Sequence, residues 1–171
     1  LGFSLSVMFF VISNHVVFLV LFWFLMGLIM SKLIGIDTDW KEAQHAAKFA
    51  RTNYLGGAIF FAIGMALLAF STNSFTRTEI LSNLSSAPNW LIILSSLSII
   101  VAAIIQSAIF PFHRWLLSAM TSPTPASALM HAGFVNGAGI LLTLFAPLFF
   151  EANVLLLIFV IGGVTAIVAQ F

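Results

Sequence analysis

The chain alternates between long apolar runs and short polar segments. Four runs, 16–34, 53–70, 90–109 and 124–145, have about the 20 mostly apolar residues that a membrane-spanning helix needs. Two more, 1–13 and 153–171, lie at the ends, where the first is too short to span and the second reaches the last residue. The pattern predicts an all-α, polytopic transmembrane helix bundle. We expect residues 1–171 to form a single transmembrane domain that is a fragment of a larger protein.

The polar segments between the runs predict two further features. Residues 39–51 have the pattern of an amphipathic helix capped by Asp39, and we expect it to lie along the membrane interface before the span at 53–70. Residues 71–89 are rich in Ser, Asn and Thr, which predicts an exposed loop with one helical turn around 76–81.

Composition supports the membrane assignment and excludes several functions. The 171 residues include only six basic and five acidic side chains, whereas about a quarter of a soluble domain is charged. A net charge of +1 and the lack of a Gly-rich phosphate loop argue against nucleic-acid and nucleotide binding. With no cysteine, the chain has no disulfide, thiolate metal site or iron–sulfur cluster.

The basic residues are distributed unevenly between the two predicted sides of the membrane. Only Arg77 falls on the side of residues 71–89, so the positive-inside rule makes the loops 35–52 and 110–123 cytoplasmic. The basic residues on this predicted cytoplasmic side are Lys32, Lys41, Lys48, Arg51 and Arg114. Trp40, Trp90 and Trp115 fall at predicted span ends, where indole rings anchor at the interface, whereas the position of Trp23 in mid-span indicates packing.

Residues 106–123 predict an interrupted helix. Pro111 stops the preceding apolar run, a short apolar turn carrying His113 and Arg114 follows, and Pro123 and Pro125 precede the next run. Irregular backbone at membrane depth is tolerated where protein or a water-filled cavity satisfies its polar groups, which points to an ion or substrate path. The alternative is an ordinary proline-rich loop at the bilayer surface.

His131 is a candidate for proton transfer because it lies several residues inside an apolar run, with Asn136 five residues further on. Ionisable groups at such depth usually face a bundle interior. The alternative is a neutral histidine that only hydrogen-bonds a neighbouring helix. Gly133, Gly137 and Gly139 give a small-residue face that favours close helix contact.

The segments 110–116 and 120–137 together resemble a known family. They read Phe-Pro-Phe-His-Arg-Trp-Leu and Met-Thr-Ser-Pro-Thr-Pro-Ala-Ser-Ala-Leu-Met-His-Ala-Gly-Phe-Val-Asn-Gly. The runs are similar to those of the antiporter-like proton-conducting subunits of complex I (subunit L type) and Mrp antiporters, and most similar to the membrane subunit of the DAB-type inorganic-carbon transporters. His131 matches the family's histidine. The residues that match its helix break are Pro111, Arg114, Trp115, Pro123, Thr124, Pro125 and Ser127.

The resemblance implies a water-linked proton path in which a broken-helix lysine, a glutamate on a neighbouring helix and a histidine take part. Three positions depart from this pattern. The lysine position is Gln106, the glutamate position is Phe24, and the start of the sixth family helix reads Tyr54-Leu-Gly-Gly57. Gln106 hydrogen-bonds water but does not exchange a proton at neutral pH. By the same resemblance the chain covers about helices 4 to 9 of its family.

We therefore expect a membrane subunit of an inorganic-carbon transporter in the cell inner membrane. It would couple proton or cation movement to a cytoplasmic zinc subunit similar to carbonic anhydrases, with no catalytic site, cofactor or metal of its own. Gln106, His113, His131 and Asn136 are the candidate path residues. Arg114 is an interfacial anchor or attracts an anion such as bicarbonate. The alternatives are a complex I or Mrp subunit, a non-conducting structural subunit, and, weakest, a haem protein ligated by His113 and His131.

Overall fold

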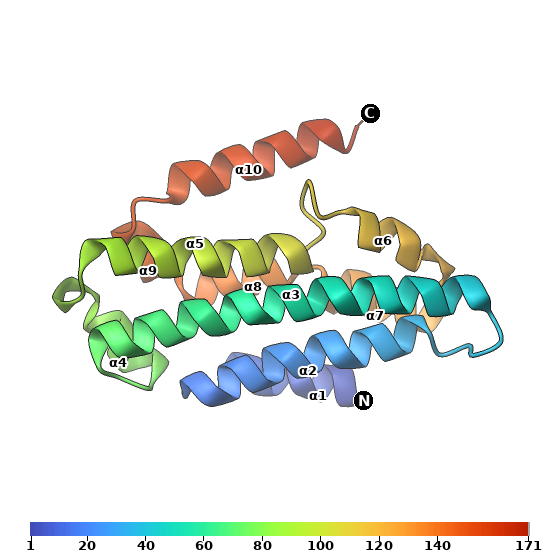
Figure 1. Ribbon diagram of the computed structural model, residues 1–171, viewed down its shortest axis with the longest axis horizontal. Helices are drawn as coiled ribbons and strands as arrows, with labels where there is room; N and C mark the ends of the chain where they lie inside the picture. The colour runs from blue at the N-terminus through green and yellow to red at the C-terminus, as the bar shows by residue number, and fades with distance from the viewer. Residues whose placement is uncertain (171) are drawn as a thin grey trace.

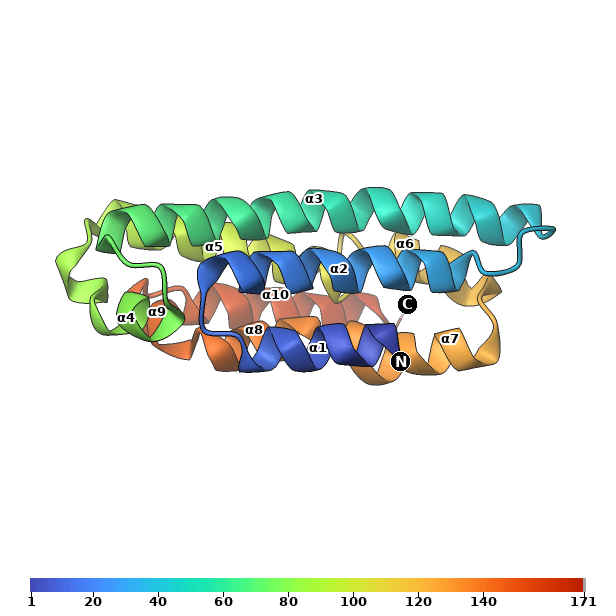
Figure 2. The ribbon, with the colours of Figure 1, turned by 90° about the horizontal axis from the view of Figure 1, so that it is seen from below.

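The apolar runs form helices that lie along one long axis, and the computed structural model describes residues 1–170 (Figures 1 and 2). No β-strand occurs in this part of the chain, so the predicted all-α bundle is confirmed. In chain order the elements are α1 (Gly2–Ile12), α2 (Val16–Ile34), α3 (Lys41–Thr72), α4 (Arg77–Ser82), η1 (Leu84–Ser86), α5 (Asn89–Gln106), α6 (Arg114–Ser118), η2 (Ala119–Thr121), α7 (Thr124–Leu129), the π-helical turn η3 (Met130–Phe134), α8 (Gly137–Leu144), α9 (Ala146–Glu151) and α10 (Leu155–Val168).

Four helical segments in residues 1–170 are long and apolar enough to cross a membrane. They are Val16–Ile34, Lys41–Thr72, Asn89–Gln106 and Thr124–Leu144. The loop before α3 and the segment around α6 lie at one end of the bundle, and α4 and α9 lie at the other (Figure 1). The chain therefore crosses the length of the bundle repeatedly, as a multi-pass membrane protein does.

Helix α3 corrects the prediction of a separate interfacial helix at residues 39–51. Its 32 residues run without interruption, which at about 1.5 Å per residue is about 48 Å. The N-terminal half is held against α6 and η2, where Ala43, Ala46 and Ala50 are buried. The predicted cap is also wrong: Trp40 precedes the helix without a side-chain cap, and the Asp39 N–H donates to the Asp37 carboxylate instead.

The most extensive helix contact, between α3 and α5, depends on small residues. A Cβ atom added at Gly64 would lie 3.0 Å from the carbonyl oxygen of Ser95 and 2.8 Å from Cγ1 of Ile99. The hydroxyls of buried Ser95 and Ser96 are hydrogen-bonded within α5. Ser95 donates to the carbonyl of Leu91, and Ser96 donates to the carbonyl of Ile92. The two backbones therefore approach closely with few unpaired polar groups, as in other membrane helix pairs.

An aromatic cluster packs α1, α2, α3 and the residue that follows α8 together. The ring of Trp23 lies 5.2 Å from that of Phe10 and 5.1 Å from that of Phe61, and Phe61 lies 6.3 Å from Phe145. All four side chains are buried. Trp23 therefore packs in the core, as its mid-span position indicated.

The turn between α1 and α2 is hydrogen-bonded to the segment after α3. The Asn14 side chain donates to the hydroxyl of Thr78 (3.0 Å) and accepts from the Thr78 N–H (3.1 Å). The Val16 N–H donates to the carbonyl of Phe75 (2.9 Å), and the Arg77 N–H donates to the carbonyl of Asn14 (2.6 Å). We call this set of bonds the Asn14 clasp. The helical turn predicted near 76–81 is α4.

Candidate functional site at a helix break

Helix α5 ends at Gln106, three residues earlier than the apolar pattern predicts. Ala108 has a φ of 53°, the left-handed conformation that ends many helices. The N–H groups of Ile109 and Ala108 then donate back to the carbonyls of Ile104 (3.0 Å) and Ile105 (3.4 Å). These two bonds form a Schellman motif, which satisfies carbonyls that the end of a helix leaves free. An exposed turn containing Pro111 follows.

Trp115 in α6 links the segment after the break to the end of α5. Its indole Nε1–H donates to the carbonyl of Ile105 (2.8 Å), and the side chain is fully buried. The ring lies edge-on to Tyr54 (4.9 Å) and Phe134 (5.9 Å). The interface-anchor prediction for Trp115 is therefore wrong, because the indole is fully buried and donates to a carbonyl at the end of α5. The predicted interrupted helix is confirmed, and a plain surface loop is not what forms.

Gln106 is buried at the end of α5, with 4% of its surface exposed. Its side chain lies on Gly137 of α8, where an added Cβ would come within 2.8 Å of Gln106 Nε2. The neighbouring Ser107 hydroxyl accepts from the Ala138 N–H (2.8 Å). The broken end of α5 is thus docked on the start of α8, and the predicted close contact at Gly137 is present.

A π-helical turn directly precedes this docking point. Within η3, the Val135 N–H donates to the carbonyl of Met130 (3.0 Å), five residues back. Such turns are rare and occur often at functional sites. Met130 and Phe134 face the core, whereas His131 is exposed on the outer surface of the described chain. The expectation that His131 faces the interior of this bundle is therefore not met within residues 1–170.

Asn136 is also exposed, and its side chain donates to the carbonyl of Ala132 (3.0 Å). It lines an open groove of about 600 Å³ together with Ser107 and Thr143. Asn136 and Ser107, which directly follows α5 at the break, therefore line the same groove. His131 does not line it.

Four buried polar atoms around the break have no hydrogen-bond partner among residues 1–170: Tyr54 Oη, Gln106 Nε2, His113 Nδ1 and Ser122 Oγ. Leaving such atoms unpaired is costly, and in folded proteins they are commonly satisfied by ordered water. Two of them, Tyr54 Oη and Gln106 Nε2, belong to buried side chains. Sequence reasoning missed Tyr54, although it is the only tyrosine in the chain and opens an apolar run.

The remaining motif residues are more exposed. His113 is half-buried with its ring stacked on that of Phe110 at 5.8 Å, and Arg114 is exposed. Pro123 and Ser127 are half-buried, and Thr124 and Pro125 are exposed in the first turn of α7. No group of three or more His, Asp or Glu side chains suited to a metal ion occurs within residues 1–170.

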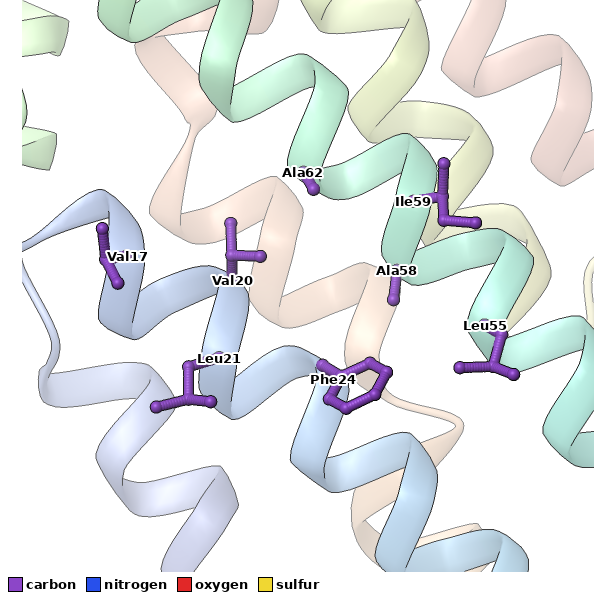
Figure 3. A pocket seen from close by; sticks show the side chains of 8 residues that line it. All are labelled: Val17, Val20, Leu21, Phe24, Leu55, Ala58, Ile59 and Ala62. Atoms are coloured by element: carbon purple, nitrogen blue, oxygen red, sulfur yellow. The ribbon is translucent and has the colours of Figure 1, made fainter.

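Phe24, the position of the family glutamate, lines an apolar groove on the outer face of α2 and α3 (Figure 3). Val20 of α2 and Leu55 and Ile59 of α3 line the same groove, which has a volume of about 400 Å³. Every residue lining it is apolar, so the Phe24 position contributes no ionisable group to the break.

The fold and the break define a polytopic helical membrane protein with a discontinuous helix. Residues 13–171 match the family model described as NADH:quinone oxidoreductase/Mrp antiporter, transmembrane. The chain belongs to this family of antiporter-like membrane subunits.

Its relatives include subunits of several complexes. The probable inorganic carbon transporter subunit DabB1 of Halothiobacillus neapolitanus is 32% identical over 96% of this chain and 31% of its own length. DabB of Bacillus anthracis is 36% identical over 86% of this chain and 30% of its own length. NADH-ubiquinone oxidoreductase chain 5 of Myxine glutinosa is 36% identical over 98% of this chain and 28% of its own length. The chain thus spans about a third of these relatives.

A solved structure has the same fold. A chain of the Mrp complex from Dietzia sp. DQ12-45-1b superposes with a TM-score of 0.77 and 29% sequence identity. The match covers 82% of this chain and 16% of the Dietzia chain.

Proposed function

We propose that this chain is part of a membrane subunit that moves protons or cations and couples that movement to inorganic-carbon transport. The helix break carries the proposal, because it leaves four buried polar atoms without a hydrogen-bond partner among residues 1–170, two of them on the buried side chains of Tyr54 and Gln106. Similarity to the DabB subunits supports the carbon-transport role. The subunit has no catalytic site of its own in this proposal, and no cofactor.

The proposed path runs through water between groups that donate and accept hydrogen bonds. Gln106 and Tyr54 each offer a buried polar atom at the break, and both order water without carrying a charge. His131 supplies the one imidazole on the adjoining π-helical turn, and a neutral imidazole has one nitrogen that donates and one that accepts a hydrogen bond. Because His131 faces outward, it serves a path that continues beyond the surface of residues 1–170.

The proposed cytoplasmic end is the one that carries the loop before α3 and the segment around α6, since five of the six basic residues fall there. The proposed partner is a cytoplasmic zinc subunit similar to carbonic anhydrases, and the proposed location is the cell inner membrane. Exposed Arg114 at this end attracts an anion such as bicarbonate.

Replacement of His131 by alanine tests the path. We expect bicarbonate uptake that collapses with an uncoupler to fall by at least about tenfold, because a proton-transfer group is lost. Uptake is measured for the full-length protein reconstituted with its partner. The matched control is His15→Ala, which changes an exposed histidine at the opposite end of the bundle. Wild-type uptake in the His131→Ala variant would remove this residue from the path.

A lysine at position 106 tests whether the path conducts without a charged group at the break. Gln106→Lys is expected to raise proton conductance in liposomes, because the lysine restores an exchangeable proton. Gln170→Lys, outside the break, is the control for added charge. If the wild type does not conduct and Gln106→Lys does not change this, the chain has a structural role and the proposal fails.

A role in complex I or an Mrp antiporter is the second candidate, favoured by the 36% identity to NADH-ubiquinone oxidoreductase chain 5. Copurification separates the two candidates. A zinc carbonic-anhydrase-like partner supports carbon transport, whereas quinone-reductase or small antiporter subunits support the alternative.

A further inference from the structure

A basic groove lies between the C-terminal end of α2 and the N-terminal part of α3. It has a volume of about 460 Å³, and its charged lining residues are Lys32, Lys48 and Arg51. Lys32 is in the last turn of α2, where the apolar helix ends, so the groove lies at the depth of a membrane interface. The groove is separate from the helix break, so binding of a ligand there is independent of the proposed function.

The charge of the groove is one-sided. None of its lining residues is a carboxylate, and the nearby acid Glu42 lines a different hollow together with Lys41 and His45. Gln44 holds the wall in place, because its side-chain amide donates to the carbonyls of Gly35 (2.7 Å) and Asp37 (2.8 Å). Three cations in one hollow with a fixed wall favour an anion.

The apolar groove lined by Phe24 and Leu55, shown in Figure 3, lies further along the same two helices. Five of the α3 residues that line the two grooves follow one another at intervals of three or four. They are Lys48 and Arg51 in the basic groove and Leu55, Ala58 and Ala62 in the apolar groove. Such steps stay on one face of a helix. The distance from Arg51 to Ala62 is eleven residues, or about 16 Å, close to half of a hydrocarbon core about 30 Å thick.

A ligand that fits both grooves is amphiphilic, with a negative headgroup and an apolar chain. We propose that the seam between α2 and α3 binds one anionic phospholipid, with its phosphate between Lys32, Lys48 and Arg51 and an acyl chain along Phe24 and Leu55. Basic pockets between membrane helices on the cytoplasmic side bind such headgroups. A free anion such as phosphate or bicarbonate would use the basic groove alone and leave the apolar groove without a role.

The test measures binding of phosphatidylglycerol to the full-length protein in detergent by native mass spectrometry. We expect the double variant Lys48→Gln, Arg51→Gln to weaken binding by about 25-fold, which is about fivefold for each basic residue near a membrane surface. The matched control is Lys41→Gln, which removes one exposed cation of the same helix from outside the groove and is expected to leave binding unchanged.

A second variant tests the apolar half of the seam. Ala62→Phe fills the apolar groove and is expected to weaken binding of long-chain phosphatidylglycerol more than binding of short-chain phosphatidylglycerol. Circular dichroism shows whether each variant folds. Any of three results would overturn the proposal: equal binding of phosphatidylcholine, competition by millimolar inorganic phosphate or bicarbonate, or wild-type binding by the double variant.

Discussion

Replacing Trp115 by alanine is expected to lower the free energy of unfolding by about 3–5 kcal/mol, the range for a large buried aromatic side chain. Trp115 is fully buried between Tyr54 and Phe134 and supplies a hydrogen bond to the carbonyl of Ile105. Its removal leaves a cavity and withdraws that bond from the end of α5. At about 2–4 °C per kcal/mol, the unfolding temperature in detergent should fall by about 10 °C.

Two further variants separate packing from hydrogen bonding. Trp115→Phe keeps a ring in the cavity but loses the donor, so a loss of about 1–3 kcal/mol is expected. Trp90→Ala removes a tryptophan that is 65% exposed, and a change within about 0.5 kcal/mol is expected. If Trp115→Ala and Trp90→Ala proved equally mild, the indole would not hold the break together.

A pair of glycine substitutions in α3 is expected to change stability in opposite directions. Gly64→Ala places a Cβ 3.0 Å from the carbonyl oxygen of Ser95, a backbone atom of α5 that moves only with its helix. Overpacking of this kind costs about 1–3 kcal/mol. Gly56→Ala meets no atom within 4 Å and should stabilise the same helix by up to about 1 kcal/mol, because alanine favours helix.

Thermal unfolding of both variants in one detergent provides the measurement. A stabilising Gly64→Ala would mean that α3 and α5 are further apart than the structure places them. Because both variants replace glycine by alanine in the same helix, the gain in helix propensity is common to both. The difference between their unfolding temperatures therefore reports the contact with α5.

The spans and the break were predictable because they depend on local sequence. Apolar run lengths mark where helices cross, and Pro111 marks a place where a helix cannot continue. The continuity of α3 was not predictable in this way. Its N-terminal half is buried by α6 and η2, which come some 70 residues later in the chain, so residues 39–51 alone have only the pattern of an amphipathic helix.

The site was harder to predict for the same reason. Trp115 is buried where its indole donates to the carbonyl of Ile105, a partner ten residues earlier that the sequence pattern does not reveal. The outward position of His131 depends on a register that the π-helical turn sets, since one residue of shift rotates a side chain by about 100°. Tyr54 was missed because a lone tyrosine in an apolar run has no pattern that distinguishes packing from a polar role.

The Asn14 clasp has a consequence for how the protein is made. When α2 has entered the membrane, the N–H of Val16 and the carbonyl of Asn14 still lack the partners they have in the finished structure. Those partners belong to residues 75–78, which reach the same side only after α3 has crossed. A delay in translocating α3 would therefore leave the turn between α1 and α2 without these hydrogen bonds.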